Sequence, residues 1–300
     1  MKTLSLFTLA LVLVTGSSAA ADPAAFQVKV TGHGRPMILI PGLACPGAVW
    51  DTTVAHFSAH YECHVLSLAG FGGTPARATA GPMLENAREE LAAYIREHRL
   101  DRPVIVGHSL GGFLALDLAA NHPELVGRLV IVDSLPFLMG AMRPGATVAD
   151  AKQAAAGMAQ GFLHMNAEAY GRMIRSGPNG STMAAAPADL DRIIAWGLAS
   201  DRATVGEAMT ELYSTDLRPA LPRITAPALI FGAWIGYAPY SSHAMATQLY
   251  RGQYSGLKNF RLEISDTARH FIMFDDPQWL FVRMDNFLAT PGSRTVSSNP

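Results

Sequence analysis

The chain has 300 residues, which is enough for one large α/β domain or two small domains. Apolar residues make up 49 % and charged residues 16 %, a composition that excludes disorder and coiled coils. The 23 basic and 24 acidic residues leave a net charge of −1 without a block of like charges, which argues against nucleic acid as a partner. With two cysteines and neither a CxxC nor an HExxH motif, the sequence predicts no disulfide scaffold, metal site or cofactor.

The first 21 residues predict an export signal. Lys2 gives a basic start, residues 4–14 form an uncharged apolar run, and residues 19–21 fit a small-residue cleavage site. A membrane-spanning helix needs about 20 apolar residues, so this run is too short for an anchor. We therefore expect a periplasmic or secreted protein that has no integral membrane segment once the signal is removed.

Short apolar runs alternate with helical patterns along the following chain. Continuous apolar runs suit parallel strands that are covered on both faces. The alternation predicts an α/β fold with a mostly parallel central sheet flanked by helices. The expected strands are residues 37–40, 64–68, 103–106, 129–132, 228–231 and 260–264, and the expected helices include 84–99 and 112–121.

Residues 135–226 interrupt this alternation. They carry helical patterns at 148–165, 167–175, 188–199 and 204–213, and no convincing strand. A helical segment of this length between two core strands predicts an inserted cap over the carboxyl edge of the sheet. The core domain would then comprise residues 22–134 and 227–289, and the polar tail 290–300 is expected to be flexible.

Residues 107–111 read Gly-His-Ser-Leu-Gly and match the G-x-S-x-G pattern. The pattern lies between an apolar strand and a helix, which is the strand–turn–helix context that it requires. Glycines two residues either side of Ser109 are expected because Cβ atoms there would collide with neighbouring backbone. The turn predicts that Ser109 presents its hydroxyl as a nucleophile at a helix N-terminus.

Three stretches resemble the α/β-hydrolase family. Residues 104–134, VIVGHSLGGFLALDLAANHPELVGRLVIVDS, look like its nucleophile elbow with the following helix and strand. Residues 215–232, TDLRPALPRITAPALIFG, resemble the return from the cap, and residues 269–288, RHFIMFDDPQWLFVRMDNFL, resemble the terminal histidine loop and last helix. The resemblance implies a serine esterase or lipase branch, because serine rather than aspartate stands at the elbow. It also implies that His108 packs against the site and orients it.

A serine nucleophile needs a general base and an oxyanion hole. His270 follows the expected last strand, and the chain order of this fold puts the base last. Leu110, directly after the nucleophile, is the first expected oxyanion donor. The second is Leu43, with Ala44 as the alternative, because Pro41-Gly42-Leu43 stands where the family commonly has His-Gly-x.

The carboxylate that would orient His270 departs from the family pattern. The family commonly has Gly-x-x-Asp after the penultimate strand, whereas residues 232–235 here read Gly-Ala-Trp-Ile. Asp133, at the carboxyl end of the preceding strand, is the expected acid, with Asp266 or no acid as alternatives. Asp275 and Asp276 precede Pro277 and are expected to cap the last helix.

The expected pocket is apolar and carries few charges, which favours an uncharged ester as the small-molecule substrate. Its expected lining residues are Ala44, His108, Leu135, Phe137, Trp234, Ile235 and Tyr237. Cys45 and Cys63 fall at opposite ends of neighbouring parallel strands, so no disulfide is expected between them.

The leading interpretation is a serine carboxylic-ester hydrolase in which Ser109 attacks, His270 moves the proton and Asp133 orients the imidazole. The same site could instead support lactone or amide hydrolysis or cofactor-free perhydrolysis, because fold and triad are shared among these activities. A non-catalytic ligand-binding protein is the other alternative, since the usual aspartate after the penultimate strand is missing. The sequence leaves the oligomeric state open.

Overall fold

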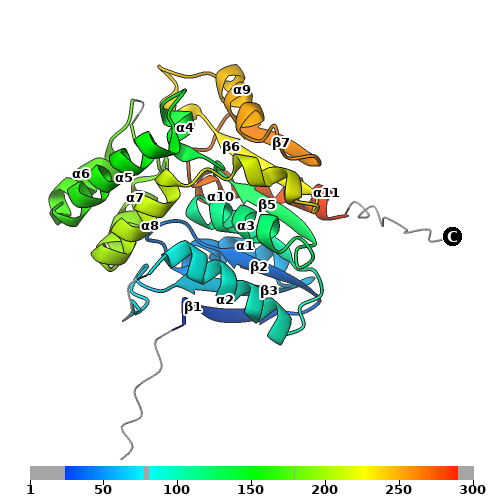
Figure 1. Cartoon of the computed structure of the whole chain (residues 1–300). Coiled ribbons are helices and arrows are strands. Elements are labelled where there is room, and N and C mark those ends of the chain that lie inside the picture. The colour runs from blue at the N-terminus through cyan, green and yellow to red at the C-terminus, as the bar shows by residue number, and fades with distance from the viewer. Residues whose placement is uncertain (1–23, 78–80, 179, 290–300) are drawn as a thin grey trace, which may run out of the picture.

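The computed structural model describes residues 24–77, 81–178 and 180–289 (Figure 1). The predicted export signal and the predicted flexible tail both lie outside these residues. The strands are β1 Phe26–Gly32, β2 Arg35–Ile40, β3 Tyr61–Leu68, β4 Val104–His108, β5 Arg128–Val132, β6 Ala228–Ala233 and β7 Phe260–Ser265. The α-helices are α1 Asp51–Phe57, α2 Met83–Glu97, α3 Leu110–Asn121, α4 Leu138–Met142, α5 Val148–Leu163, α6 Ala167–Arg175, α7 Pro187–Leu198, α8 Arg202–Ser214, α9 His243–Gln253, α10 Ile272–Asp275 and α11 Pro277–Ala289. Three 3-10 helices are η1 Gly47–Trp50, η2 Arg218–Arg223 and η3 Ile235–Tyr237.

The strands form one sheet in the order β1-β3-β2-β4-β5-β6-β7. Only β1 runs antiparallel to its neighbour, and the other pairs are parallel. The predicted mostly parallel sheet is therefore confirmed, and each of the six expected strands is present within a few residues of its predicted range. The sequence reading missed β1, an edge strand in which Phe26 alone is buried.

The middle of the sheet is the centre of the hydrophobic core. Every residue of β4 and β5 is buried, as continuous apolar runs predict for strands covered on both faces. Helices α2 and α3 cover the face turned to the viewer in Figure 1, and α1 packs with α11 on the other face. This two-sided cover follows from right-handed crossovers between parallel strands.

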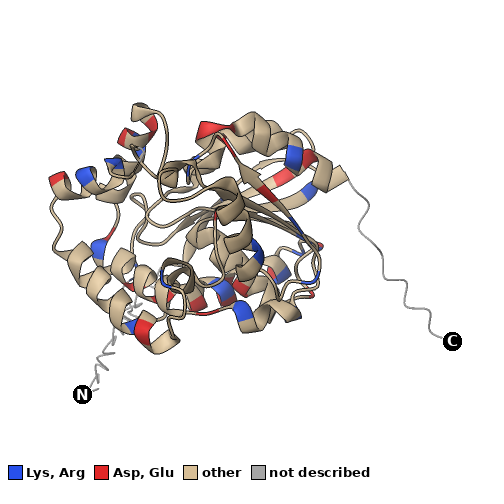
Figure 2. Cartoon of the chain, turned by 90° about the horizontal axis from the view of Figure 1, so that it is seen from above, with Lys and Arg blue, Asp and Glu red and all other residues tan. Residues whose placement is uncertain are grey.

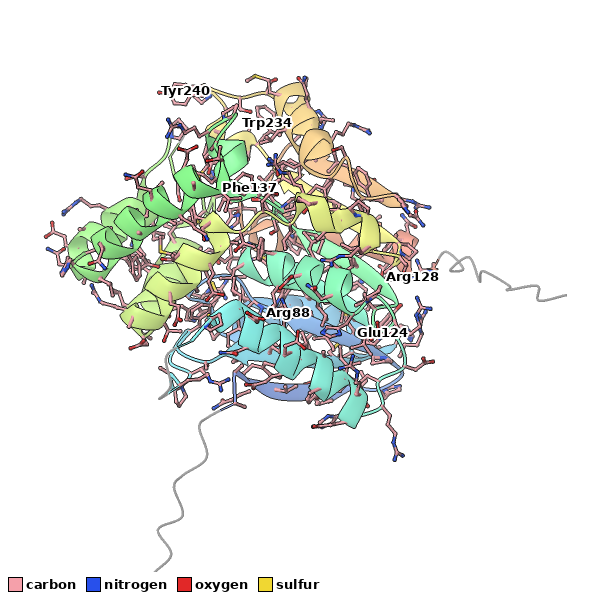
Figure 3. All side chains as sticks on the ribbon, in the orientation of Figure 1. Arg88, Glu124, Arg128, Phe137, Trp234 and Tyr240 are labelled. Carbon is pink, nitrogen blue, oxygen red and sulfur yellow. The ribbon has the colours of Figure 1, made fainter. Side chains whose placement is uncertain are left out.

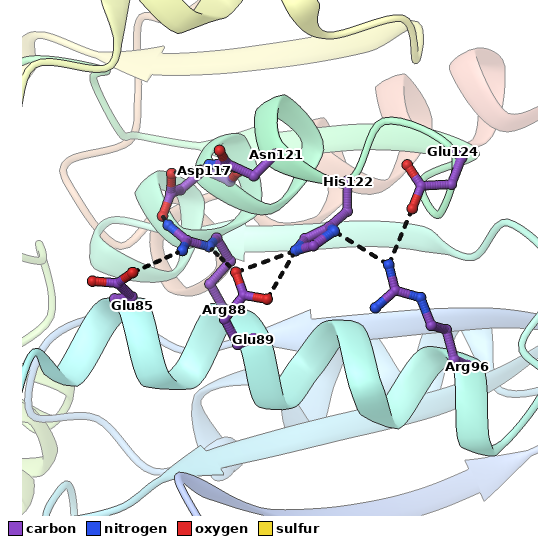
Figure 4. A network of polar contacts seen from close by, with 8 residues as sticks. All are labelled: Glu85, Arg88, Glu89, Arg96, Asp117, Asn121, His122 and Glu124. Carbon is purple, nitrogen blue, oxygen red and sulfur yellow. Dashed lines mark hydrogen bonds and ion pairs between the residues drawn. The ribbon is translucent and has the colours of Figure 1, made fainter.

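A network of polar side chains joins α2 to α3 and to the segment that follows α3 (Figure 4). Asp117 is the acidic residue in the almost wholly buried helix α3, and its carboxylate accepts a hydrogen bond from Arg88 at 2.9 Å. Burial raises the pKa of Asp117 above its usual range, against the opposing effect of Arg88. A charge in this position needs a partner, and Arg88 on α2 supplies it.

The described residues between β5 and β6 contain the helices α4 to α8, which extend beyond one end of the sheet in Figure 1. The ranges of α5 to α8 match the four predicted helical patterns, whereas α4 was not predicted. Helix α5 packs along α8, and α6 packs against α7. The N-termini of α5, α6 and α8 are capped by Thr147, Asn166 and Asp201. The division into a core and a cap domain at residues 135 and 226 stays a prediction.

Charges of both signs are scattered over the molecule, as Figure 2 shows for Lys, Arg, Asp and Glu. Among the described helices, none is long and apolar enough to cross a membrane. In the same residues, His, Cys, Asp and Glu nowhere gather in a group of three that could hold a metal ion.

The two cysteines are free thiols, and both are buried. The parallel register pairs Cys63 with Met37, whereas Cys45 follows the other end of β2. Burial raises the pKa of Cys45 to about 12 and that of Cys63 to about 11. Both side chains therefore stay protonated and unreactive at neutral pH.

Glu211 on α8 connects the helices after β5 to the core. Its carboxylate accepts the backbone N–H groups of Met83 at 2.6 Å and Leu84 at 3.0 Å, in the first turn of α2. Pro82, the N-cap residue of α2, has no side-chain cap of its own, so Glu211 serves as a cap from a distant helix. Burial, with a contribution from Glu207, raises the pKa of Glu211 from 4.5 to about 7.

We expect Glu211 to make the protein less stable at pH 8 than at pH 5. Because the folded-state pKa lies above the unfolded value, this group's contribution is complete below about pH 4.5 and is lost as the pH rises through 7. After allowance for partial exposure, the loss in the free energy of unfolding is about 1–3 kcal/mol. Glu211→Gln should remove this part of the slope in urea unfolding, whereas the exposed control Glu168→Gln should keep it. An unchanged slope in Glu211→Gln would contradict the assignment.

Candidate active site

Ser109 lies in a sharp turn between β4 and α3. Its backbone has φ 53° and ψ −120°, a conformation that residues other than glycine rarely adopt. A Cβ at Gly107 would lie 2.2 Å from the Gly111 carbonyl oxygen, and one at Gly111 would lie 2.3 Å from the Ile40 carbonyl oxygen. Both glycines are therefore required by the close approach of backbone, and the turn presents Ser109 at the start of α3.

The turn after β2 approaches Ser109 from the other side. A Cβ at Gly42 would lie 3.2 Å from the Ser109 Cβ and 2.8 Å from His108 Nδ1. The Cys45 N–H donates to the Gly42 carbonyl oxygen at 3.2 Å, and Ala44 has φ 59°. Leu110 is the first residue of α3, so the helix offers no partner for its N–H group. The structure thus places the two segments that carry the expected oxyanion donors, Leu43 and Leu110, on either side of Ser109.

His270 pairs with Asp133. The His270 Nδ1 and Asp133 Oδ2 atoms are 2.6 Å apart, although 137 residues separate the two positions in the chain. Asp133 follows β5 directly, with φ 48°, and its N–H donates to the Phe231 carbonyl oxygen at 2.9 Å. The Ser109 N–H donates to the Val132 carbonyl oxygen at 3.0 Å, which fixes the serine beside the residue that precedes Asp133.

Two more groups contact the Asp133 carboxylate. Its Oδ1 accepts the Ala233 N–H at 2.8 Å and the Tyr250 hydroxyl at 2.5 Å. The side chain of Asp133 is 12 % exposed, and that of His270 is 24 % exposed. A carboxylate buried to this degree is stable as an anion only if donors surround it, and here three donors do so.

His108 lies beneath His270. The two rings are 4.6 Å apart between centroids, and His108 Nε2 donates to the His270 carbonyl oxygen at 3.1 Å. Since a carbonyl oxygen can only accept, the proton of the neutral ring is on Nε2. Burial, with a contribution from the charge of His270, holds the pKa of His108 well below its usual range. His108 is therefore a neutral packing residue at neutral pH.

The model of the alpha/beta hydrolase family matches residues 37–282, which is more than four fifths of the chain. The chain belongs to the alpha/beta hydrolase family. The match begins in β2 and ends in α11, so it includes the elbow, the segment between β5 and β6, and the His270 loop.

Two kinds of curated hydrolase relatives are similar in sequence. A pimeloyl-[acyl-carrier protein] methyl ester esterase of Vibrio cholerae is 35 % identical over 108 residues, 36 % of this chain and 40 % of that protein. The putative carbamate hydrolase RutD of Serratia proteamaculans is 27 % identical over 257 residues, 81 % of this chain and 90 % of that protein. The match therefore spans about two fifths of the esterase's length and most of the RutD length.

Solved hydrolase structures share the fold at low sequence identity. An esterase from Exiguobacterium antarcticum has a TM-score of 0.71 at 16 % identity, over 88 % of this chain and 96 % of that chain. An enol-lactonase from Burkholderia xenovorans LB400 has a TM-score of 0.63 at 18 % identity, over 88 % of this chain and 96 % of that chain. These likenesses support the alpha/beta hydrolase fold and leave the substrate open.

In this alpha/beta hydrolase the alternative acid, Asp266, contacts Trp234 rather than His270. Its Oδ1 accepts the indole N–H of Trp234 at 2.9 Å. Ile235, at the position where the family commonly has its acid, opens the short helix η3. The carboxylate that contacts His270 is that of Asp133.

A segment between α6 and α7 holds the His270 loop, and sequence reasoning missed it. The N–H groups of His270 and Phe271 donate to the carbonyl oxygens of Thr182 at 3.1 Å and Met183 at 2.9 Å. Asp275 does not cap the last helix as expected. Its carboxylate instead accepts the N–H groups of Arg269 and Ala185, both at 2.8 Å, while Asp276 accepts from Trp279 N at 3.2 Å, in the first turn of α11.

The expected pocket residues divide into buried and accessible ones. Phe137 and His108 are each 0 % exposed, and their assignment to the substrate pocket stays a prediction. Phe137 packs with Met139 and Ala151, and the Arg218 guanidinium lies 4.7 Å from its ring centroid. A large aromatic side chain in an apolar stretch serves here as core rather than as a binding surface.

The other expected lining residues lie nearer the surface. Leu135, Trp234 and Ile235 are partly exposed, Tyr237 is exposed, and Ala44 is buried. Figure 3 shows Trp234 and Tyr240 at the end of the molecule where α4 and α9 lie, with Phe137 deeper in the fold. The η3 segment, with its N-cap residue Trp234, therefore presents accessible aromatic and aliphatic side chains at this end of the molecule.

Proposed function

We propose that the protein is a serine hydrolase that cleaves uncharged carboxylic esters through an acyl-enzyme intermediate. The observation that carries the proposal is the 2.6 Å contact between His270 and Asp133, beside a serine held in the strained elbow conformation. In a serine hydrolase the serine is the nucleophile, the histidine is its general base, and the carboxylate orients the histidine.

The reaction divides into acylation and deacylation. Ser109 Oγ attacks the ester carbonyl and forms a C–O bond, while His270 Nε2 takes the hydroxyl proton. The intermediate collapses, the ester C–O bond breaks, and His270 returns the proton to the leaving alcohol. A water molecule, deprotonated by His270, then attacks the acyl-enzyme, and Ser109 leaves with the proton.

The other groups act on charge that develops in these steps. Asp133 accepts a hydrogen bond from the Nδ1–H of His270, which keeps Nε2 free to act as the base and stabilises the imidazolium. The N–H groups of Leu110 and Leu43 stabilise the negative oxygen of the intermediate, assisted by the N-terminus of α3. Four segments distant in sequence thus supply the groups of the proposed site.

The substrate class follows from the surroundings of the site. Leu135, Trp234, Ile235 and Tyr237 supply apolar surface, which favours aliphatic or aromatic acyl groups. The name of the Vibrio cholerae relative includes an ester substrate, and this supports ester hydrolysis. Carbamate hydrolysis is the second candidate, because the RutD relative matches 81 % of this chain.

A fluorophosphonate probe followed by a substrate panel tests this proposal. The protein should be labelled at Ser109, as mapped by peptide mass spectrometry, because such probes modify only activated serines. The panel comprises p-nitrophenyl esters of graded chain length, an aryl carbamate, a lactone and an anilide, and the esters should be hydrolysed fastest. Absence of labelling would favour the ligand-binding alternative, and faster turnover of the carbamate, lactone or anilide would replace the ester assignment.

A further inference from the structure

Two tyrosines at the C-terminal end of α9 contact residues after β5: Tyr250 lies in the helix, and Tyr254 is its C-cap residue. Tyr250 and Tyr254 are one helical turn apart, and their rings stack with centroids 6.5 Å apart. The Tyr250 hydroxyl donates to Asp133 Oδ1 at 2.5 Å, and the Tyr254 hydroxyl donates to the Ser134 carbonyl oxygen at 2.8 Å. Both side chains are buried, so each contact is protected from competing water.

We propose that Tyr250 is a positioning residue that holds the Asp133 carboxylate in the orientation His270 requires and reduces its negative charge. This inference rests on the proposed function. Oδ1 is occupied by Tyr250 and Ala233, which leaves Oδ2 directed at His270 Nδ1. Rotation of the carboxylate about its Cβ–Cγ bond would break both Oδ1 contacts at once. The phenol therefore fixes the direction from which the imidazole is held.

The chain provides the space that Tyr250 needs. Gly232 in β6 lies against the Tyr250 ring, and a Cβ at this glycine would be 2.7 Å from one ring atom and 2.8 Å from another. Any side chain at residue 232 would therefore displace the phenol from Asp133. An acid placed after β5 is thus matched by a glycine in β6 and a tyrosine in α9.

The phenol remains a donor over the whole working pH range. Burial and the nearby Asp133 raise the pKa of Tyr250 well above its usual value, so the hydroxyl keeps its proton. By donating a hydrogen bond, the Tyr250 hydroxyl draws charge from the carboxylate and weakens the attraction between Asp133 and the protonated imidazole. Removing the hydroxyl should therefore strengthen that attraction and let the protonated, inactive form of His270 persist to higher pH.

Three titratable side chains interact electrostatically with this pair. They are His108 at the end of β4, Tyr237 in η3 and Tyr254 at the C-cap of α9. All three are neutral at neutral pH, because the pKa of His108 is lowered and those of Tyr237 and Tyr254 are raised. The ionisable side chains of Arg269, next to His270, and of Asp275, which accepts the Arg269 N–H at 2.8 Å, are the same in both variants. The effect of a change at Tyr250 is therefore measured on Asp133 and His270.

Tyr250→Phe and its matched control Tyr254→Phe test the inference. Each removes one hydroxyl at the C-terminal end of α9, but only the Tyr250 hydroxyl donates a hydrogen bond to Asp133, whereas that of Tyr254 donates to the Ser134 carbonyl oxygen. On a p-nitrophenyl ester, Tyr250→Phe should lower kcat by about tenfold and change KM by less than about twofold. The acid limb of its kcat/KM profile should move to higher pH by about half a unit. Tyr254→Phe should retain the wild-type acid limb and a kcat within about twofold.

A structural role for Tyr250 would have a different result. Both variants would then lose similar thermal stability and keep the wild-type acid limb, which would overturn the inference. A fall in kcat for Tyr250→Phe without a shift of the acid limb would overturn it as well.

The His270 ring protons, followed by NMR through a pH titration, separate this inference from the proposed function. Their midpoint should rise by about half a unit in Tyr250→Phe whether or not the protein hydrolyses esters. A shifted midpoint in a protein that a fluorophosphonate does not label would refute the hydrolase and retain the Tyr250–Asp133 coupling. An unshifted midpoint in a labelled, active enzyme would refute the coupling alone.

Discussion

Replacing Ser109 with alanine is expected to reduce ester hydrolysis to near background, a loss in kcat of about 10⁴–10⁶-fold. The variant lacks the oxygen that forms the acyl-enzyme, whereas the turn glycines and the His270–Asp133 pair are unchanged. The residual rate should come from the oxyanion donors and from substrate binding. The measurement is steady-state hydrolysis of a p-nitrophenyl ester by the purified variant.

Two controls accompany this measurement. Ser58→Ala makes the same change at the end of α1, away from the elbow, and should keep full activity. Urea unfolding should show that Ser109→Ala is folded, because alanine keeps the Cβ and the backbone conformation of the elbow. Full activity in folded Ser109→Ala would end the assignment of Ser109 as the nucleophile.

The second large effect is expected at Asp133. Asp133→Asn keeps the shape of the side chain but removes its charge, and its amide can donate to His270 Nδ1. The imidazole would then carry its proton on Nε2 and could not accept the Ser109 proton. We expect kcat to fall by about 10²–10⁴-fold with a small change in KM.

Asp266→Asn is the matched comparison for Asp133→Asn. Asp266 contacts Trp234 rather than His270, and an asparagine oxygen can still accept the indole N–H, so the loss should be below about tenfold. Both variants are assayed on one ester, with folding checked by circular dichroism. A severe loss in Asp266→Asn beside a nearly intact Asp133→Asn would reverse the assignment. Mild losses in both would indicate a His–Ser dyad.

Local patterns account for the elements that the sequence predicted well. The strands β4 and β5 are continuous apolar runs, and the helix α3 between them is buried almost throughout. Burial on all sides requires apolar side chains at most positions, and that requirement is visible in a single segment. Edge strand β1 was missed for the opposite reason, because a strand with one buried residue has little such signal.

Contacts between distant segments explain the rest. The carboxylate of Glu211 caps α2 from 127 and 128 residues away, and Thr182 and Met183, between α6 and α7, hold the His270 loop. Phe137 and Tyr237 are both aromatic residues after a core strand, yet one is fully buried and the other is 53 % exposed. No spacing in the sequence distinguishes these two, because burial depends on what the rest of the chain places over them.

The sequence by itself determined the alpha/beta architecture and the position of the serine turn. Each of these features leaves a local pattern: an apolar run for a buried parallel strand, a periodic or apolar stretch for a helix, and two sterically required glycines for the turn. It left two carboxylates as partners for His270, since Asp266 is near in sequence and Asp133 is 137 residues away. Only the tertiary structure decided that contact. Parallel pairing places the end of β5 beside β6, where the Ala233 N–H and the Tyr250 hydroxyl donate to the partly buried Asp133 carboxylate, while the Trp234 indole N–H donates to Asp266.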